Sequence, residues 1–234
     1  AAGHQVVVVS SGAIAAGMPA MGIGAADRPR DSRTLQAIAA VGQTRLMTTW
    51  SDALAGRDGA VAAQVLLAPL DFMVRQQYLH ARATLARLLE LGVVPIVNEN
   101  DAIADDEIRF GDNDRIAALV AQLVSADTLA LLTDAPGVLT ADPRLDADAT
   151  LIDEIVEVDQ QLMAVAGGAG SARGSGGMVT KLAAARIAAW SGVRTVIADA
   201  GRDRVVLDAI EDRDGVGTAI RPRSTRLSAR KVWI

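Results

Sequence analysis

The sequence predicts an α/β fold, a three-layer αβα sandwich with a largely parallel central sheet. Short β-branched and aliphatic runs alternate with amphipathic helical patterns almost throughout its 234 residues. Hydrophobic residues make up 50% of the chain and aromatic residues only 3%, so the core must be large and aliphatic. No break in composition and no internal repeat divides the chain, which predicts a single domain covering residues 1–234.

The composition also excludes several classes of protein. The absence of cysteine excludes disulfides, thiolate metal sites and a cysteine nucleophile, and two distant histidines, His4 and His80, disfavour a histidine metal site or a Ser-His-Asp triad. With 28 acidic and 23 basic residues, net charge -5, a nucleic-acid partner is disfavoured. No apolar run approaches the ~20 residues of a membrane span, and the first residues lack a signal-peptide pattern. We expect a soluble cytoplasmic protein.

The first half of the chain predicts alternating strands and helices. Gln5–Ser10 is a continuous β-branched run, typical of a buried parallel strand. Asp31 or Ser32 can cap a long helix that extends to about Leu54, although Gly42 interrupts its apolar stripe. The next predicted elements are a strand at Val61–Leu67, a connector at Asp71–Arg75, a helix at Gln77–Leu91 and a strand at Val93–Val97.

The second half continues the alternation. Its most flexible-looking stretch is the glycine-rich segment Ala164–Gly177, and Asp134–Gly137 is predicted to be a turn. The predicted elements are a helix at Ile116–Val124, a strand at Thr128–Thr133, an edge strand at Leu151–Val156, a helix at Met178–Gly192, a strand at Val193–Ala198, a helix at Arg204–Ile210 and a short strand within Gly215–Ile234.

A polar segment, Asn98–Asp114, follows the predicted strand Val93–Val97. Seven of its residues are acidic and one, Arg109, is basic. This density of charge predicts a long loop at the carboxyl end of a strand, where open α/β sheets bind their ligands. On composition alone, a solvated acidic loop or a divalent-cation site fits equally well.

Two glycine-containing segments are candidates for binding an anion. Ser11, Gly12 and Ala13 lie between a strand and a helix, a geometry that presents free backbone N–H groups, although an ordinary βα turn has the same pattern. In Gly174–Lys181, glycines precede a helix whose first turn carries a lysine. This segment matches neither the Walker A pattern nor the dinucleotide fingerprint, and a flexible linker is the alternative.

The three segments together favour phosphoryl transfer. A glycine-rich loop with a lysine, a Ser-Gly-Ala turn and an Asn/Asp-rich loop supply groups that position reactants and neutralise charge. No side chain is an obvious strong nucleophile or histidine base, so the substrate would supply its own nucleophile.

The chain resembles the amino acid kinase family, and within it the bacterial branch that phosphorylates L-glutamate. The matching segments occur in the order of the family and are Val9–Gly17, Ala40–Gln43, Asn98–Asp101, Glu107–Asp114, Leu131–Asp134, Ala141–Arg144 and Gly174–Lys181. The motifs N-E-N-D and G-D-N-D are specific for this branch, whereas the glycine-rich loop alone would not be. The resemblance implies ATP-dependent phosphorylation of the L-glutamate γ-carboxylate, the first step of proline biosynthesis.

The resemblance also implies roles for individual residues. Ser11, Asp101 and Asn113 would bind glutamate, with Asn98 nearby and Asp101 meeting the substrate ammonium. The backbone amides of Gly12 and Ala13 would face the transferring phosphoryl group. ATP would be held by Thr133, Asp134, Ser175, Gly176, Gly177, Met178, Val179, Thr180 and Lys181. Lys181 and Asp114 would be catalytic, Lys181 by neutralising phosphate charge and Asp114 by organising basic groups. Mg²⁺ would be held mainly by the ATP phosphates, without metal ligands from the protein.

The chain departs from the family pattern in two places. The family begins with a strand bearing a K-x-G-[ST] lysine, whereas this sequence opens at Ala1, near the end of the following helix. We therefore expect an N-terminally incomplete amino acid kinase fold that lacks its first strand, with two internal strand edges left unpaired. From the same pattern we expect no PUA domain, which some members carry. Proline inhibition and homo-oligomerisation are family traits that the residues do not establish.

The missing lysine keeps two alternatives open. One is a module that binds glutamate, proline or nucleotide without turnover. The other is a sister kinase with a different acceptor, although N-E-N-D and G-D-N-D argue against it.

Overall fold

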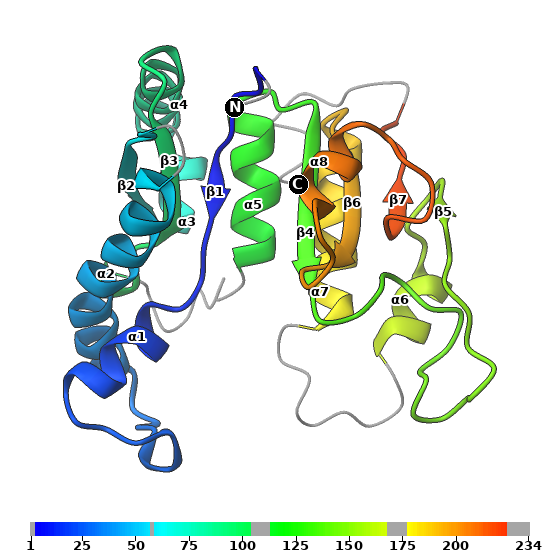
Figure 1. The fold of residues 1–234 in the computed structure, drawn as a ribbon, viewed down its shortest axis with the longest axis horizontal. Coiled ribbons are helices and arrows are strands. Elements are labelled where there is room, and N and C mark those ends of the chain that lie inside the picture. The colour runs from blue at the N-terminus through cyan, green and yellow to red at the C-terminus, as the bar shows by residue number, and fades with distance from the viewer. Residues whose placement is uncertain (1–2, 57–58, 104–112, 168–176, 224–234) are drawn as a thin grey trace. The chain divides into compact units, whose positions relative to one another are not determined.

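The structure, a computed structural model, describes residues 3–56, 59–103, 113–167 and 177–223. Its contacts divide the chain into two compact units, Ala1–Ile116 and Ala117–Ile234 (Figure 1). Each unit contains its own sheet flanked by helices. None of the helices in the described ranges is long and apolar enough to cross a membrane.

The sheet of the first unit is entirely parallel. It contains β1 (Val8–Val9), β2 (Ala62–Leu67) and β3 (Val94–Glu99) in the order β1-β3-β2. The strand predicted at Gln5–Ser10 is shorter than expected, because the described part of the chain pairs β1 with β3 alone. β3 extends past the predicted end at Val97, because β2 continues to pair with it as far as Glu99.

The helices of the first unit differ from the prediction at one place. α2 (Ser32–Ala55) begins as predicted, because the Asp31 carboxylate accepts from the Thr34 N–H at 2.9 Å. The predicted connector Asp71–Arg75 is wrong, since α3 (Pro69–Met73) occupies most of it and α4 (Arg75–Glu90) follows at once. Proline at the first helical position and an Asp71 carboxylate that accepts from the Ala68 N–H at 2.6 Å explain this short helix. The remaining helical elements are α1 (Ala13–Ala20), η1 (Ala25–Asp27) and η2 (Asp101–Ile103).

Gly42 has a structural reason to interrupt the stripe of α2. α1 crosses α2 there so closely that a Cβ on Gly42 would lie 1.7 Å from the carbonyl oxygen of Ala13. On the facing helix, a Cβ on Gly17 would lie 2.0 Å from the carbonyl oxygen of Ile38. The two glycines therefore fix the position of α1, and with it the turn that precedes α1.

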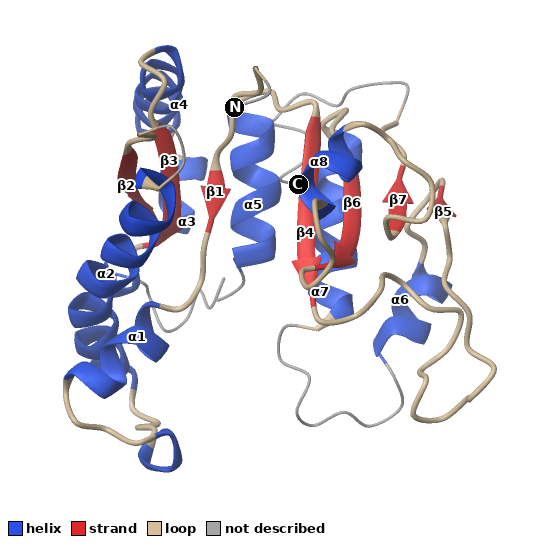
Figure 2. Cartoon of the chain, viewed as in Figure 1, coloured by secondary structure: helices blue, strands red, loops and turns tan. Residues whose placement is uncertain are grey.

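The sheet of the second unit is mixed. Figure 2 shows its strands in the order β4 (Thr128–Thr133), β6 (Arg194–Asp199), β7 (Thr218–Ile220) and β5 (Glu154–Ile155). β4 is parallel to β6 and β5 to β7, whereas β7 runs antiparallel to β6. The predicted edge strand Leu151–Val156 contracts to β5, while Leu151 forms an isolated bridge with Leu139.

The helices of the second unit also differ from the prediction at one place. Besides α7 (Met178–Trp190) and α8 (Val205–Ile210), the chain forms α6 (Gln160–Gly167), which overlaps the stretch predicted as flexible. The Asp159 carboxylate accepts from the Leu162 N–H at 2.8 Å and starts this helix. The later part of the stretch, residues 168–176, lies outside the described residues.

The cores are aliphatic, as the composition predicts. α5 (Asn113–Leu123) begins in the first unit and continues into the second. Most of its residues are buried. Alanine lines one face of α7, so that this helix lies close to β6. Among the most buried large side chains are Ile38, Leu85 and Ile96 in the first unit and Leu123, Leu182 and Ile197 in the second.

Candidate functional site

The carboxyl ends of β1 and β3 bring two predicted site residues to one edge of the first sheet. The strands are parallel neighbours, and the pairing continues as the Ser10 N–H donates to the Val97 carbonyl at 2.9 Å. Ser11 follows β1, and Asn98 is the second-last residue of β3. This is the edge of a parallel sheet at which α/β proteins bind their ligands.

Asn113 joins these two residues. It is the first residue of α5, and its side-chain amide donates to the Ser11 hydroxyl at 2.6 Å and to the Asn98 amide oxygen at 3.2 Å. Asn98 is 4% exposed, and its amide oxygen also accepts from the Glu99 N–H at 2.8 Å. The Asn113 amide oxygen is buried and has no hydrogen-bond partner among the described residues. A buried acceptor in this position favours a ligand that donates a hydrogen bond.

Burial gives this edge of the sheet an unusual electrostatic character. It raises the pKa of the Glu99 carboxyl, with the negative charge of Asp101 as a second cause. Burial also raises the pKa of Asp101. Two carboxylates that are costly to ionise would be stabilised by a cationic group, such as an ammonium.

The Ser11-Gly12-Ala13 turn has the geometry predicted for it. Gly12 has φ 110°, a left-handed conformation that favours glycine, and it is the N-cap of α1. Ala13 opens the helix, and the Ala16 N–H already donates to the Gly12 carbonyl at 2.8 Å. The first N–H groups of such a helix have no acceptor within it, so an anion can bind them.

Two residues near this edge were not assigned a role by sequence reasoning. The Trp50 indole N–H donates to the Ser10 hydroxyl at 3.1 Å. Gln43 is buried; its amide oxygen accepts from Gln64 at 2.9 Å, and its side-chain nitrogen has no partner in the described part of the chain. Gln43 belongs to the segment Ala40–Gln43 that matches the family, but its contact with Gln64 of β2 could be found only from the structure.

The second unit gathers most of the residues predicted to hold ATP at one edge of its own sheet. Thr133 ends β4, and its hydroxyl donates to the Asp134 carboxylate at 3.2 Å. α7 begins at Met178 and is followed by β6, which is parallel to β4. Because the last turn of this helix leads to the amino end of β6, its first turn lies at the carboxyl ends of β4 and β6. In that turn the Thr180 hydroxyl donates to the Gly177 carbonyl at 2.8 Å, and Lys181 is half-buried.

The remaining predicted residues are placed only in part. Asp114 is half-buried in the first turn of α5 beside Asn113. Val179 lies in the first turn of α7. Ser175 and Gly176 lie outside the described residues, as do residues 104–112 of the acidic segment. Across the described ranges, no three acidic or histidine side chains are grouped so that they could hold a metal ion.

Comparison with known proteins gives a family match and close relatives. A model described as the amino acid kinase family matches residues 1–199. Curated glutamate 5-kinases from Burkholderia mallei (strain SAVP1) and Azoarcus sp. (strain BH72) are 52% and 53% identical over 233 and 234 residues. The match covers 100% of this chain and 62% of each relative, so the chain spans less than two thirds of their length.

Solved structures share the fold at low sequence identity. The carbamate kinase from Giardia lamblia bound to AMP-PNP has a TM-score of 0.61 and 17% identity, and covers 94% of this chain and 85% of its own. The uridylate kinase from Archaeoglobus fulgidus has a TM-score of 0.57 and 21% identity, with 94% and 86% covered. These similarities confirm the predicted α/β sandwich class.

Proposed function

The chain belongs to the amino acid kinase family, and we propose that it carries the machinery for ATP-dependent phosphorylation of the L-glutamate γ-carboxylate. The observation that supports this most strongly is the hydrogen-bonded group Ser11, Asn98 and Asn113, together with the half-buried Asp101 carboxyl two residues after the end of β3. It coincides with the two motifs, N-E-N-D and G-D-N-D, that distinguish the glutamate branch. The 52% identity to curated glutamate 5-kinases supports the same acceptor.

In this proposal the first unit binds the amino acid. Asp101 receives the substrate ammonium, which offsets the cost of ionising a half-buried carboxylate. Ser11, Asn98 and Asn113 orient the substrate through neutral hydrogen bonds, and the Asn113 amide oxygen, which has no partner among the described residues, accepts from it. The amides of Gly12 and Ala13 stabilise negative charge on the transferring phosphoryl group.

The second unit binds the nucleotide. Thr133, Asp134 and Ser175–Lys181 hold ATP, and Lys181 neutralises charge on the phosphates during transfer. A γ-carboxylate oxygen of glutamate forms the new bond to the γ-phosphorus, and the bond from that phosphorus to the oxygen of the leaving ADP breaks. Asp114 organises the basic groups around this centre. Mg²⁺ accompanies ATP and is held mainly by its phosphates.

A hydroxylamine-trapping assay tests the proposal. With ATP and Mg²⁺, the full-length protein should form γ-glutamyl hydroxamate in proportion to glutamate, and far less hydroxamate with aspartate or N-acetylglutamate as acceptor. UMP, whose phosphorylated product cannot form a hydroxamate, is tested by the release of ADP. Absence of any glutamate-dependent signal would refute the reaction. A preference for another acceptor would instead identify a sister kinase, and tight binding without product would identify a non-catalytic module.

Three further expectations remain predictions of the family resemblance. They are inhibition by proline, assembly into a homo-oligomer and a cytoplasmic location.

A further inference from the structure

The second unit contains a cavity of about 300 Å³ at the end of α7 away from the proposed ATP residues. Val158, Ala189 and Ile220 are buried and line it with apolar surface. Trp190 ends α7, whereas Lys181 lies in its first turn, about 13 Å away along the helix axis. The cavity is therefore separate from the edge that carries Lys181.

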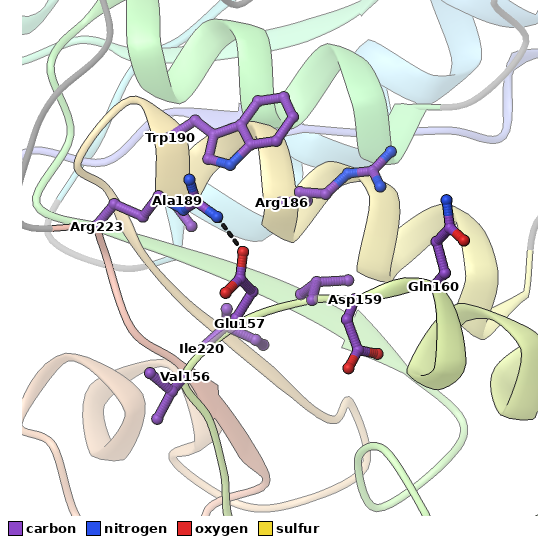
Figure 3. Close-up of a pocket in the computed structure, with 10 residues that line it drawn as sticks. Val156, Glu157, Asp159, Gln160, Arg186, Ala189, Trp190, Ile220 and Arg223 are labelled. Carbon is purple, nitrogen blue, oxygen red and sulfur yellow. Dashed lines mark hydrogen bonds and ion pairs between the residues drawn. The ribbon is translucent and has the colours of Figure 1, made fainter.

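Two guanidinium groups lie near the Trp190 indole in this cavity (Figure 3). The central carbon of Arg186 is 5.6 Å from the ring centroid and that of Arg223 is 5.8 Å from it. Both distances are within the range of cation–π attraction, which restricts where each charged group can lie. Arg223 is also held by its backbone, since its N–H donates to the Ala189 carbonyl at 3.0 Å.

Three of the four charged side chains that line the cavity have a partner of opposite charge or a hydrogen bond. Glu157 forms an ion pair with Arg223, and the Asp159 carboxylate accepts from the Leu162 N–H at the start of α6. Arg186 has no carboxylate partner among the described residues. A half-buried guanidinium over an indole, with five donors and no carboxylate partner in the described ranges, is matched to a carboxylate.

We propose that this cavity binds a small organic carboxylate, with the carboxylate on Arg186 and a flat apolar body against Ala189 and Ile220. The volume is at the lower end of the range for ligand pockets, which favours a small molecule over a polypeptide. A guanidinium recognises a carboxylate in the plane of its fork, so the body of the ligand continues along the apolar floor. This site goes beyond the kinase proposal and needs neither ATP nor glutamate.

Benzoate tests the site, with benzamide as its neutral isostere. In ¹H–¹⁵N spectra of the full chain without nucleotide, benzoate should shift the Trp190 indole N–H signal saturably, with a Kd on the order of 1 mM. The signal is assigned by its loss in Trp190→Phe. Benzamide should bind about tenfold more weakly or worse, because it lacks the charge-assisted hydrogen bonds.

Variants separate Arg186 from a general effect of charge. Arg186→Gln should weaken benzoate binding about tenfold or more, whereas Arg186→Lys, which keeps the charge, should retain part of it. Arg82→Gln, the matched control, removes one positive charge from an exposed position in the first unit and should leave Kd unchanged. The proposal is overturned if benzoate gives no saturable shift, if benzamide binds as well, or if folded Arg186→Gln keeps the wild-type Kd. A kinase-inactive protein with an intact benzoate response would refute only the proposed reaction.

Discussion

At the scale of single residues, Asp101 carries the charge on which the proposed glutamate site depends. Asp101→Asn should raise KM for glutamate about tenfold or more while changing kcat little, because a charge-assisted hydrogen bond to the substrate ammonium contributes about 1.5–3 kcal/mol. Steady-state kinetics of hydroxamate formation measure both constants. Asp52→Asn, an exposed acid of the same unit, should leave KM unchanged. An unaltered KM in Asp101→Asn would remove Asp101 from the substrate site.

Glu99 predicts how stability responds to pH. Burial and the charge of Asp101 raise its pKa in the folded protein. The unfolded chain therefore loses this proton at lower pH than the folded chain, so the Glu99 contribution to stability falls as pH rises above about 4. Glu99→Gln abolishes this loss, so its Tm relative to wild type should rise between pH 4 and pH 7. A Tm difference that stays constant with pH would contradict the raised pKa.

At the scale of elements, the crossing of α1 and α2 positions the Ser11-Gly12 turn. Gly42→Ala should lower Tm and destabilise the protein by about 1–3 kcal/mol, because its Cβ would overlap the Ala13 carbonyl. Gly56→Ala is the matched control: Gly56 caps the same helix in a right-handed conformation, and its Cβ would meet nothing closer than 4.0 Å. Thermal unfolding compares the two. Equal Tm values in both variants would show that the helices can separate at no cost.

Regular elements could be predicted from sequence where periodicity or a cap was clear. The strand Thr128–Thr133 has the predicted bounds, and Asp31 caps α2 as expected. The two short helices α3 and α6 were not predicted, because proline in the first and glycines at the end of the second are typical of turns and loops. Each helix has only one or two turns and is started by an aspartate that accepts from a backbone N–H. Short helices rely on such local contacts more than on an apolar stripe.

The site could be predicted as a set of residues but not as a geometry. Motif resemblance selected Ser11, Asn98 and Asn113, yet their contact depends on β1 lying beside β3 and on α5 starting at Asn113 rather than near Ile116. The sequence of β1 alone does not fix its neighbour. The same limit applies to Gln43, whose partner Gln64 lies on a different element.

At the scale of the whole molecule, the two sheets carry the two halves of the proposed reaction. In the described part of the chain, β1 pairs only with β3 and β4 only with β6. The acceptor residues belong to the first unit and the nucleotide residues to the second. Substitutions in the two units should therefore alter different kinetic constants.

Hydroxamate formation by the full-length wild-type protein, Asn113→Ala and Lys181→Met, each checked for folding by its Tm, tests this division most directly. The wild type should form γ-glutamyl hydroxamate with ATP and Mg²⁺. Asn113→Ala should raise KM for glutamate about tenfold, and Lys181→Met should lower kcat at least about a hundredfold with little change in that KM. The claim is contradicted if the wild type forms no glutamate-dependent product, or if folded Asn113→Ala keeps the wild-type KM.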